Sequence, residues 1–322
     1  MIKVAMVGLG GMGGSHFRIY MDIENVEVIA VCEIREDMAK EKIGDADVRL
    51  YTDIDEMLKN EKPDMIDICT PSFLHAEHSV KALEAGFHVL CEKPMSINTE
   101  GTKKIMDAIE KTDKFFMTAH VVRFMHPYMY LKAVIDSGEL GKLVRLDMKR
   151  ISSIPRWSWD DWMRDTKRSG GTPMDLSIHD IDFVQFVLGQ PKSVNAVYKK
   201  LSGNNDFIVS NLIYDDFLVS CEGTWYNADI KFEGSFKAIF QDGTLILKDG
   251  KLYRNGEEVK LDFEDSEADT GINITSTDGW PGELEYFTNC VRENKAPEYV
   301  TPESSEESVR LVERILEKAI ML

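Results

Sequence analysis

The chain has 322 residues, of which 43% are hydrophobic and 29% are charged. This composition is typical of a soluble globular protein, and the length is sufficient for two domains that each bury a core. The formal net charge of -18 argues against a nucleic acid or an anionic membrane as a partner, because either would repel the protein.

The five cysteines are widely spaced and form no CxxC pair. They therefore predict neither a zinc site nor a disulfide framework, and we expect no metal. The apolar run after Met1 is too short for a secretory signal, and no later run is long enough to span a bilayer. The sequence thus predicts a reduced, cytoplasmic protein.

A glycine-rich motif follows directly after an apolar strand, residues 2–7, and leads into a helical pattern. In this context Gly8 permits a tight turn, Gly10 lets the backbone approach a pyrophosphate, and Gly13 lets helix and strand pack closely. The first N–H groups of the helix would bind the phosphates. A plain glycine-rich turn is the alternative. The predicted cofactor-binding loop consists of Gly8, Gly10, Gly11, Met12 and Gly13.

An acidic residue, Glu33, ends the second predicted strand. It lies about 20 residues beyond the glycines, where a carboxylate binds the two ribose hydroxyls of NAD. A 2′-phosphate would meet a like charge there, so we expect NAD as the cofactor and NADP to be disfavoured. Arg35 is a second candidate contact, because its guanidinium can partly offset the charge of Glu33. The other interpretation of Glu33 is a surface acid at a strand end.

Two further apolar strands end at X-Pro sequences. Because Pro cannot continue a strand, each strand must stop there, and the carboxyl ends of strands are where open α/β sheets bind ligands. The candidate cofactor contacts at these ends are Thr70, Pro71, His75, Glu92 and Lys93. Strands that alternate with helices over residues 1–120 predict an α/β Rossmann domain, a doubly wound parallel sheet of about six strands.

Residues 121–322 follow a different pattern, which predicts a second, α+β domain. Short alternating runs separated by turns between residues 193 and 263 predict a large, mostly antiparallel open sheet. Periodicity predicts helices over residues 281–292 and 303–321.

The predicted open sheet also suggests an oligomer. Its second face is expected to carry four aromatic residues, which are Tyr198, Phe232, Phe236 and Phe240. A soluble, highly charged chain is not expected to leave such an aromatic face exposed to solvent. We therefore expect a homodimer or homotetramer built through this sheet.

Two stretches before the open sheet contain candidate substrate-binding residues. The pair Gly170-Gly171 precedes an apolar-periodic segment, so it is interpreted as a turn that opens a helix. Asp175 and His179 are four residues apart and would share one face of that helix. Upstream lie three tryptophans that are either core residues or a lid stacking on a sugar ring, namely Trp157, Trp159 and Trp162.

In this order, the motifs resemble the glucose–fructose oxidoreductase, inositol dehydrogenase and MocA-like (Gfo/Idh/MocA) family of NAD(P)-dependent oxidoreductases. The resemblance covers nearly the whole chain. The matching stretches are Gly8 to Gly13, Cys69-Thr70-Pro71 with His75, residues 82–86 leading to Glu92-Lys93-Pro94, Arg123-Phe124 with Pro127, residues 137–142, and residues 171–182. It implies that Lys93, Asp175 and His179 are the catalytic groups.

The resemblance also implies a substrate site. One departure is the segment that ends at Trp280, where similar proteins commonly carry a tyrosine that reaches the substrate. Trp280 keeps the aromatic face but offers only an N–H donor, which places inositol-type recognition at that point in question. The predicted substrate-binding residues are Lys93, Arg123, Trp157, Asp175, His179 and Trp280.

The expected chemistry is the oxidation of a secondary alcohol, which requires removal of the hydroxyl proton while a hydride leaves carbon. His179 is the candidate base, because an imidazole titrates near neutrality. Lys93 can donate to the hydroxyl oxygen and stabilise its developing charge. Asp175 can hold the lysine ammonium or orient the substrate. The alternatives are a structural helix histidine for His179 and an acid favoured by the helix dipole for Asp175.

We therefore expect an NAD-dependent dehydrogenase that acts on a cyclic polyol or sugar, inositol-like in chemistry. The same groups would serve a nucleotide-sugar 3-dehydrogenase or an aldose or diketone reductase. An alternative of another class is a regulatory protein that senses NAD(H) without turnover. Such a protein would not need the proton relay that Lys93, Asp175 and His179 imply.

Overall fold

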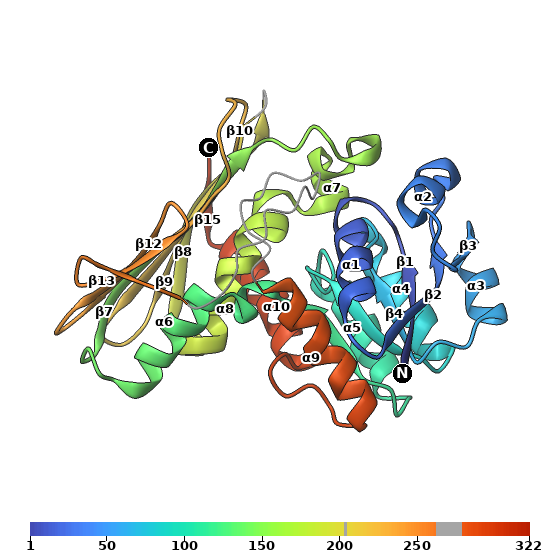
Figure 1. The fold of residues 1–322 in the computed structure, drawn as a ribbon. Coiled ribbons are helices and arrows are strands. Elements are labelled where there is room, and N and C mark those ends of the chain that lie inside the picture. Colours follow the sequence, from blue (N-terminus) through green and yellow to red (C-terminus); the bar gives the residue numbers. More distant parts are fainter. Residues whose placement is uncertain (203–204, 262–278) are drawn as a thin grey trace. The chain divides into compact units, whose positions relative to one another are not determined.

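The structure, a computed structural model, describes residues 1–202, 205–261 and 279–322. The chain forms two compact units (Figure 1). The first contains Met1–His120 together with Trp280–Glu306, and the second contains the described residues from Val121 to position 261 together with Glu307–Leu322. Residues 280–306, which sequence reasoning placed in the second domain, thus pack with the first unit.

The first unit is built on a six-stranded sheet with strand order β3-β2-β1-β4-β5-β6. Every neighbouring pair is parallel, so the predicted doubly wound Rossmann sheet is confirmed. Its strands are β1 (Ile2–Val7), β2 (Val26–Cys32), β3 (Arg49–Tyr51), β4 (Met65–Ile68), β5 (His88–Glu92) and β6 (Phe116–Ala119). Its helices include α1 (Gly11–Asp22), α2 (Glu36–Ile43), α3 (Ile54–Asn60), η1 (Ser72–Leu74), α4 (His75–Glu84), α5 (Thr99–Ile109) and α9 (Trp280–Glu293).

The central strands of this sheet are apolar because helices cover both faces. All four residues of β4 are buried, and β1 is buried at every position except Lys3. Apart from Lys3 on β1 and the buried Asp67 on β4, both strands are apolar, as is typical of parallel strands. Helix α9 contributes to the same core from late in the sequence, since its Leu284 and Phe287 are fully buried and it contacts α1 and β1.

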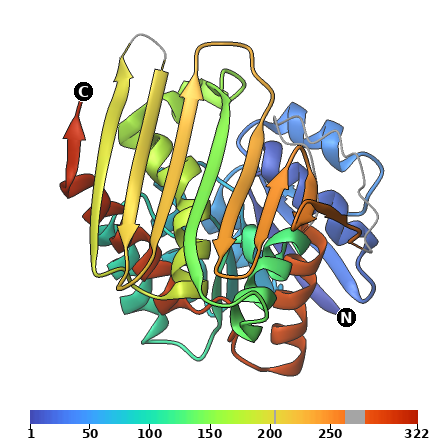
Figure 2. The same cartoon turned by 90° about the vertical axis from the view of Figure 1, so that its left-hand side faces the viewer.

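The described residues of the second unit form a nine-stranded, mostly antiparallel sheet, as predicted (Figure 2). The strand order is β14-β13-β12-β11-β7-β10-β9-β8-β15. The strands are β7 (Leu143–Ser153), β8 (Ser193–Ser202), β9 (Asn205–Ile213), β10 (Leu218–Tyr226), β11 (Glu233–Phe240), β12 (Thr244–Lys248), β13 (Lys251–Arg254), β14 (Glu257–Val259) and β15 (Ala319–Met321). The helical segments are η2 (Val121–Phe124), α6 (His126–Ser137), η3 (Trp159–Arg164), α7 (Thr166–Ser169), the π-helical turn η4 (Pro173–Ser177) and α8 (Ile178–Leu188). Helix α10 (Pro302–Glu317) begins in the first unit and ends in the second.

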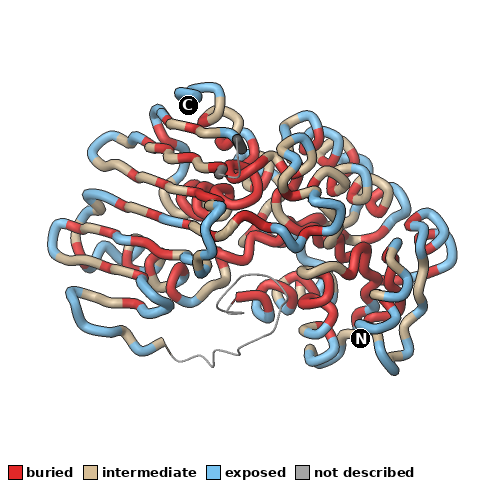
Figure 3. The backbone as a smooth tube through the Cα atoms, turned by 90° about the horizontal axis from the view of Figure 1, so that it is seen from above, coloured by how far each residue is buried: buried red, intermediate tan, exposed pale blue. Residues whose placement is uncertain are grey.

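Side chains on one face of this sheet form the core of the unit. Buried and partly exposed residues alternate along its strands (Figure 3). Tyr198, Phe236 and Phe240 are all buried and lie on the core face, while Phe232 precedes β11 and packs against the cluster around Ile154. The prediction that these four aromatic residues cover the second face was therefore wrong: the strand register turns Tyr198, Phe236 and Phe240 inward, and Phe232 packs on the Ile154 cluster from outside the strand.

Two elements differ from the sequence-based prediction. Strand β7 lies in the middle of the sheet, parallel to β10 and antiparallel to β11, although no strand was predicted there. The predicted helix over residues 303–321 ends at Glu317, and Ala319–Met321 instead form β15, which adds to the sheet edge beside β8. Among the described helices, none combines the length and the hydropathy that crossing a bilayer requires.

Candidate active site

The glycine loop between β1 and α1 is shaped by contacts that only glycine permits. A Cβ on Gly13 would lie 2.1 Å from the carbonyl oxygen of Gly8, and one on Gly8, whose φ is +90°, would lie 2.7 Å from that of Cys69. Helix α1 begins at Gly11 without a side-chain cap and without an acidic residue in its first turn. Its first N–H groups are therefore suited to an anionic pyrophosphate.

Glu33 anchors this loop from the end of β2. Its carboxylate accepts the backbone N–H of Leu9 at 2.9 Å and the Nε–H of Arg35 at 2.9 Å. Burial alone would raise the pKa of Glu33, but Arg35 and the backbone N–H donors outweigh burial and lower it. The ionised carboxylate is therefore held at the predicted position, with Arg35 paired to it.

A second cation, Lys42 on α2, contacts the same loop and was not predicted. Its Nζ donates to the carbonyl oxygens of Leu9 at 3.0 Å and Gly10 at 2.6 Å. Burial, reinforced by Arg35, lowers the pKa of Lys42. The sequence carries no signal for this contact, because an isolated lysine on an amphipathic helix is usually solvated.

His75 connects the loops that follow β4 and β5. Its Nδ1 lies 2.7 Å from the carbonyl oxygen of Pro94 and its Nε2 lies 2.8 Å from that of Thr70. The ring is buried, which lowers its pKa although both carbonyl groups act in the opposite direction. The structure thus shows His75 holding two loops together, with Pro71 beginning the turn that leads to it.

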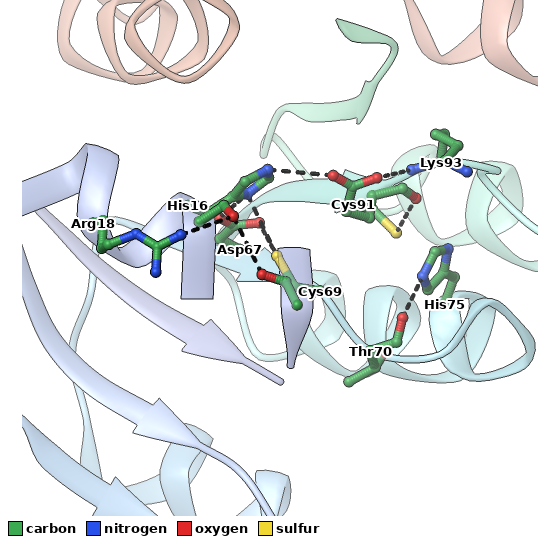
Figure 4. A network of polar contacts seen from close by, with 11 residues as sticks. His16, Arg18, Asp67, Cys69, Thr70, His75, Cys91 and Lys93 are labelled. Carbon is green, nitrogen blue, oxygen red and sulfur yellow. Dashed lines mark hydrogen bonds and ion pairs between the residues drawn. The ribbon is translucent and has the colours of Figure 1, made fainter. Parts of the chain in front are cut away.

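Glu92 is the last residue of β5 and Lys93 follows it, beside a buried polar cluster (Figure 4). The backbone N–H of Lys93 donates to Oε2 of Glu92 at 3.0 Å. The other carboxylate oxygen lies 3.2 Å from Nε2 of His16, whose Nδ1 lies 2.9 Å from Asp67. Sequence reasoning did not assign His16 or Asp67 to the site. The available signal was a charged residue inside an otherwise apolar strand, β4.

In the second unit, the Gly-Gly turn leads into a π-helical turn rather than directly into an α-helix. Gly170 and Gly171 have φ values of +78° and +67°, and Thr172 Oγ1 donates to Asp206 on β9 at 2.8 Å. Asp175 lies buried within the π-turn, and His179 is partly exposed in the first turn of α8. Single π-turns are frequent at functional sites.

Two buried ion pairs fix α8 just after this segment. Arg150 on β7 donates to Asp180 at 2.7 Å. Arg123 forms a bidentate pair with Asp182, through Nε at 2.9 Å and a terminal nitrogen at 2.7 Å. Arg123 is only 1% exposed and its guanidinium pairs with Asp182; its contact with the substrate stays a prediction.

The tryptophans differ in environment. Trp157 and Trp159 are 50% and 42% exposed, whereas Trp162 packs against the core cluster of Ile154, Met163, Leu176 and Trp225. Of the three tryptophans, which the sequence predicts to be either core residues or a lid, only Trp162 is therefore a core residue. Trp280 is buried in the first turn of α9, within the first unit; Asp278, which precedes it in the predicted motif, lies outside the described residues.

The sequence matches two profiles of one family. Residues 2–120 match the profile described as an oxidoreductase family with an NAD-binding Rossmann fold. Residues 128–246 match the GFO/IDH/MocA C-terminal domain. The glycine loop and the anchored carboxylate of Glu33 described above fit an NAD-binding domain.

Individual relatives agree with this assignment. The chain is 32% identical over 201 residues to D-glucoside 3-dehydrogenase of Escherichia coli K12, covering 61% of this chain and 57% of that protein. It is 30% identical over 188 residues to 2,7-anhydro-N-acetylneuraminate hydratase of Mediterraneibacter gnavus, covering 58% and 50%. The alignments thus span about half the length of these curated relatives.

A solved structure has the same fold. Myo-inositol 2-dehydrogenase from Lactobacillus plantarum superimposes with a TM-score of 0.80 at 22% identity, over 98% of this chain and 96% of that one. At this identity the similarity establishes the fold alone. Together with the two profiles, it shows that the chain belongs to the Gfo/Idh/MocA family of oxidoreductases and that residues 2–120 are its NAD-binding Rossmann domain.

Proposed function

We propose that this protein is an NAD-dependent dehydrogenase that oxidises a secondary alcohol of a cyclic polyol or sugar. The observation that carries the proposal is the position of Lys93. It follows the last residue of β5 in an NAD-binding sheet, and its backbone is fixed by the carboxylate of Glu92. A lysine held at the carboxyl end of a Rossmann strand is placed where such sheets bind ligands.

The proposed roles follow from the chemistry of each group. Bound NAD supplies the hydride acceptor. Lys93 donates a hydrogen bond to the reacting hydroxyl and stabilises its developing negative charge. His179, at the start of α8, takes the hydroxyl proton, which suits an imidazole near neutral pH. Asp175 orients the lysine ammonium or the substrate from the π-turn.

The cofactor residues are proposed from the same geometry. Glu33 binds the ribose hydroxyls, with Arg35 paired beside it. The glycine loop binds the pyrophosphate, and the segment Thr70 to His75 shapes the wall of the cofactor site. These assignments favour NAD over NADP, because a 2′-phosphate would approach an ionised carboxylate.

The substrate class is supported by relatives. One is named a D-glucoside 3-dehydrogenase, and others are named inositol 2-dehydrogenases. A related protein is named a hydratase, so an assay must detect hydride transfer itself and not merely consumption of a sugar.

The test is a panel of polyols, sugars and nucleotide sugars incubated with NAD and followed at the NADH absorbance. We expect turnover of at least one cyclic secondary alcohol, and a loss of about 10²- to 10⁴-fold in kcat for Lys93→Met. Lys103→Met is the matched control, because Lys103 is exposed on α5 and pairs only with Asp107 in the described contacts. Tight NAD binding without turnover of any panel member would instead favour the NAD(H)-sensing protein. A full-rate Lys93→Met enzyme would overturn the mechanism.

We also propose a homodimer or homotetramer built through the outer face of the second sheet. That face carries partly exposed apolar side chains in register, with Val197 opposite Val209. In the adjoining strands Glu222 lies opposite Lys149, and their side chains form a long ion pair at 3.9 Å. Such a mixed face resembles ordinary interface composition. Sedimentation at micromolar concentration tests it: Val209→Asp should shift an oligomer toward monomer, whereas a monomeric wild-type protein would refute it.

A cytoplasmic location is proposed from the thiols. All five cysteines lie within the described residues and all are free. Disulfides form and persist mainly in oxidising compartments, so a chain with five unpaired thiols suits a reducing one. Fractionation of the native host would test this, and recovery of the protein outside the cytoplasm would contradict it.

A further inference from the structure

We propose that His16 acts as a positioning residue for Lys93, as an imidazolium that holds the carboxylate of Glu92 in place. The inference rests on the proposed function, in which Lys93 contacts the substrate. His16 lies on α1, one turn after the start of the glycine loop's helix, and its side chain is fully buried. No family motif quoted above includes it.

The first argument is the chemistry of its two ring nitrogens. Nδ1 lies 2.9 Å from Asp67 and Nε2 lies 3.2 Å from Glu92, and both of these partners are carboxylates. A neutral imidazole can donate through one nitrogen only, and the lone pair of the other nitrogen would face an anion. Only the doubly protonated ring presents positive charge to both carboxylates; the contact of Nε2 with Glu92 is an ion pair at 3.2 Å and lacks the geometry of a hydrogen bond.

The second argument is charge balance in the cluster. Asp67 is completely buried and Glu92 nearly so, and a buried carboxylate requires a paired charge. His16 is the cation that lies between the two. Burial acts to lower the pKa of His16, but Cys69 and Asp67 raise it. Burial acts to raise the pKa of Glu92, but His16, as the main opposing cause, lowers it.

Other titratable groups face the same ring. Cys69, at the end of β4, places its Sγ 3.4 Å from Nδ1 of His16, and the Tyr20 ring meets the imidazole edge-on at 6.5 Å between centroids. Glu283 on α9 is buried nearby and acts electrostatically on Tyr20. None of these neighbours carries a positive charge, so none of them opposes protonation of His16, and the pKa values of Cys69 and Tyr20 are both raised.

The third argument is the connection to Lys93 (Figure 4). Glu92 uses one oxygen for His16 and the other to accept the backbone N–H of Lys93 at 3.0 Å. A carboxylate fixed at one oxygen has little freedom at the other. His16 therefore links the helix that begins at the pyrophosphate loop to the backbone of the proposed catalytic lysine. The same link would transmit small displacements of α1 to Lys93.

The kinetic test uses His16→Asn, with His88→Gln as the matched control. His88 is a structural histidine at the start of β5 that accepts the N–H of Phe115. We expect His16→Asn to lower kcat by about 10- to 100-fold, as misplacing a catalytic group by about 1 Å does, while the Kd for NAD changes little. His88→Gln should retain kcat.

The double variant separates positioning from folding. In a Lys93→Met background, His16→Asn should cause almost no further loss of kcat, because the group that it positions is gone. Multiplicative losses, or a weakened affinity for NAD in place of a lower kcat, would overturn the proposal. Absence of activity in the wild-type enzyme would refute the proposed function and leave the next measurement to decide this inference.

The activity-independent test is NMR. The Lys93 amide should show protection from hydrogen exchange that is lost in His16→Asn, and His16 should carry protons on both ring nitrogens at pH 8. Glu92→Gln should reduce that double protonation. A Lys93 amide unaffected by His16→Asn would overturn the proposal. A stoichiometric metal ion bound by His16, Asp67 and Cys69, whose donor atoms lie within 4.8 Å of one another, would also overturn it, because the metal would replace the Nδ1 proton.

Discussion

The backbone N–H of Leu9 donates to the carboxylate of Glu33 at 2.9 Å. The acid at the end of β2 therefore shapes the glycine loop, in addition to its proposed contact with the ribose. Arg35 pairs with the same carboxylate through its backbone and side chain. The loop geometry and the proposed cofactor preference thus involve the same side chain.

We predict that Glu33→Ser narrows the preference for NAD over NADP. The change removes the like charge that a 2′-phosphate would meet and leaves Arg35 available to pair with the phosphate. A charge-assisted hydrogen bond contributes about 1.5–3 kcal/mol, so we expect the ratio of the two Kd values to fall by roughly 10- to 100-fold. Calorimetric titration of both cofactors measures this ratio.

The control for that variant is Glu36→Ser on α2, where an exposed glutamate pairs with Lys40. It should leave the ratio unchanged. Equal affinity of the wild-type protein for NAD and NADP would contradict the assignment of Glu33 at the outset.

We predict that Lys93 and His179 act as one unit. His179→Ala should lower kcat by about 10²- to 10⁴-fold with little effect on NAD affinity, as for Lys93→Met. The double variant should lose far less than the product of the two single losses. Asp175→Asn, which keeps the shape but removes the charge, should also lower kcat. Steady-state kinetics on the identified substrate measure these effects, and strictly multiplicative losses would show that the two residues act independently.

We predict that Gly223 on β10 is required for the π-turn to seat against the sheet. A Cβ at this position would lie 2.9 Å from Cβ of Ser177, closer than packed carbon atoms approach. Gly223→Ala should lower the free energy of unfolding by about 1–3 kcal/mol and reduce kcat, because Asp175 lies in the displaced turn.

Gly282→Ala is the matched control, since no atom lies within 4 Å of a Cβ built there. Gly282 is in helix α9, where alanine should raise the free energy of unfolding by about 0.5–1 kcal/mol. Denaturant titration of both variants gives the comparison. Equal stability of Gly223→Ala and wild type would show that the sheet and turn adjust without cost.

We predict that His78 contributes to acid sensitivity. Burial lowers the pKa of His78 to about 4, whereas an unfolded histidine titrates near about 6.5. The unfolded chain therefore takes up the proton first as pH falls, and the free energy of unfolding decreases between these two values. At pH 5 the loss is about 2 kcal/mol relative to neutral pH.

His78→Asn keeps a polar partner for Thr70, whose Oγ1 lies 3.2 Å from Nδ1 of His78, but cannot titrate. Between pH 7 and pH 5, the free energy of unfolding of this variant should fall by about 2 kcal/mol less than that of the wild type. Denaturant titrations at the two pH values test it, and an NMR titration of His78 with a midpoint above pH 6 would exclude the effect.

The fold of the first unit could be predicted well because most of its strands pair with strands that are close to them in the sequence. Strands alternate with helices along the chain, and most strands pair in parallel with the next strand in sequence, so periodicity and X-Pro stops mark the elements directly. The glycines around Gly8 and the acid Glu33 also have fixed spacings that follow from how a dinucleotide is bound.

The second unit shows what sequence patterns leave undetermined. Strand β7 pairs with β10 and β11, which follow it only much later in the chain, and periodicity carries no information about distant partners. The inward direction of Phe236 and Phe240 depends on strand register, which a shift of one residue reverses.

The sequence predicted the motif residues of the candidate site but not the buried residues that contact them. Lys42, His16 and Asp67 are single polar residues whose importance depends on burial and on a partner distant in sequence. Arg123 matched a family motif, and the structure shows its guanidinium paired with Asp182 on α8. A motif match indicates that a residue is important, but it does not show whether the residue contacts a ligand or stabilises the fold.

The return of α9 to the Rossmann sheet has a consequence for biosynthesis. The strands of that sheet all emerge from the ribosome before His120, but Leu284 and Phe287, which bury against α1 and β1, are translated much later. At about 5–20 residues per second, the wait is on the order of ten seconds. During that interval the nascent chain lacks the helix that contacts α1 and β1, so the apolar surface that α9 later covers stays exposed.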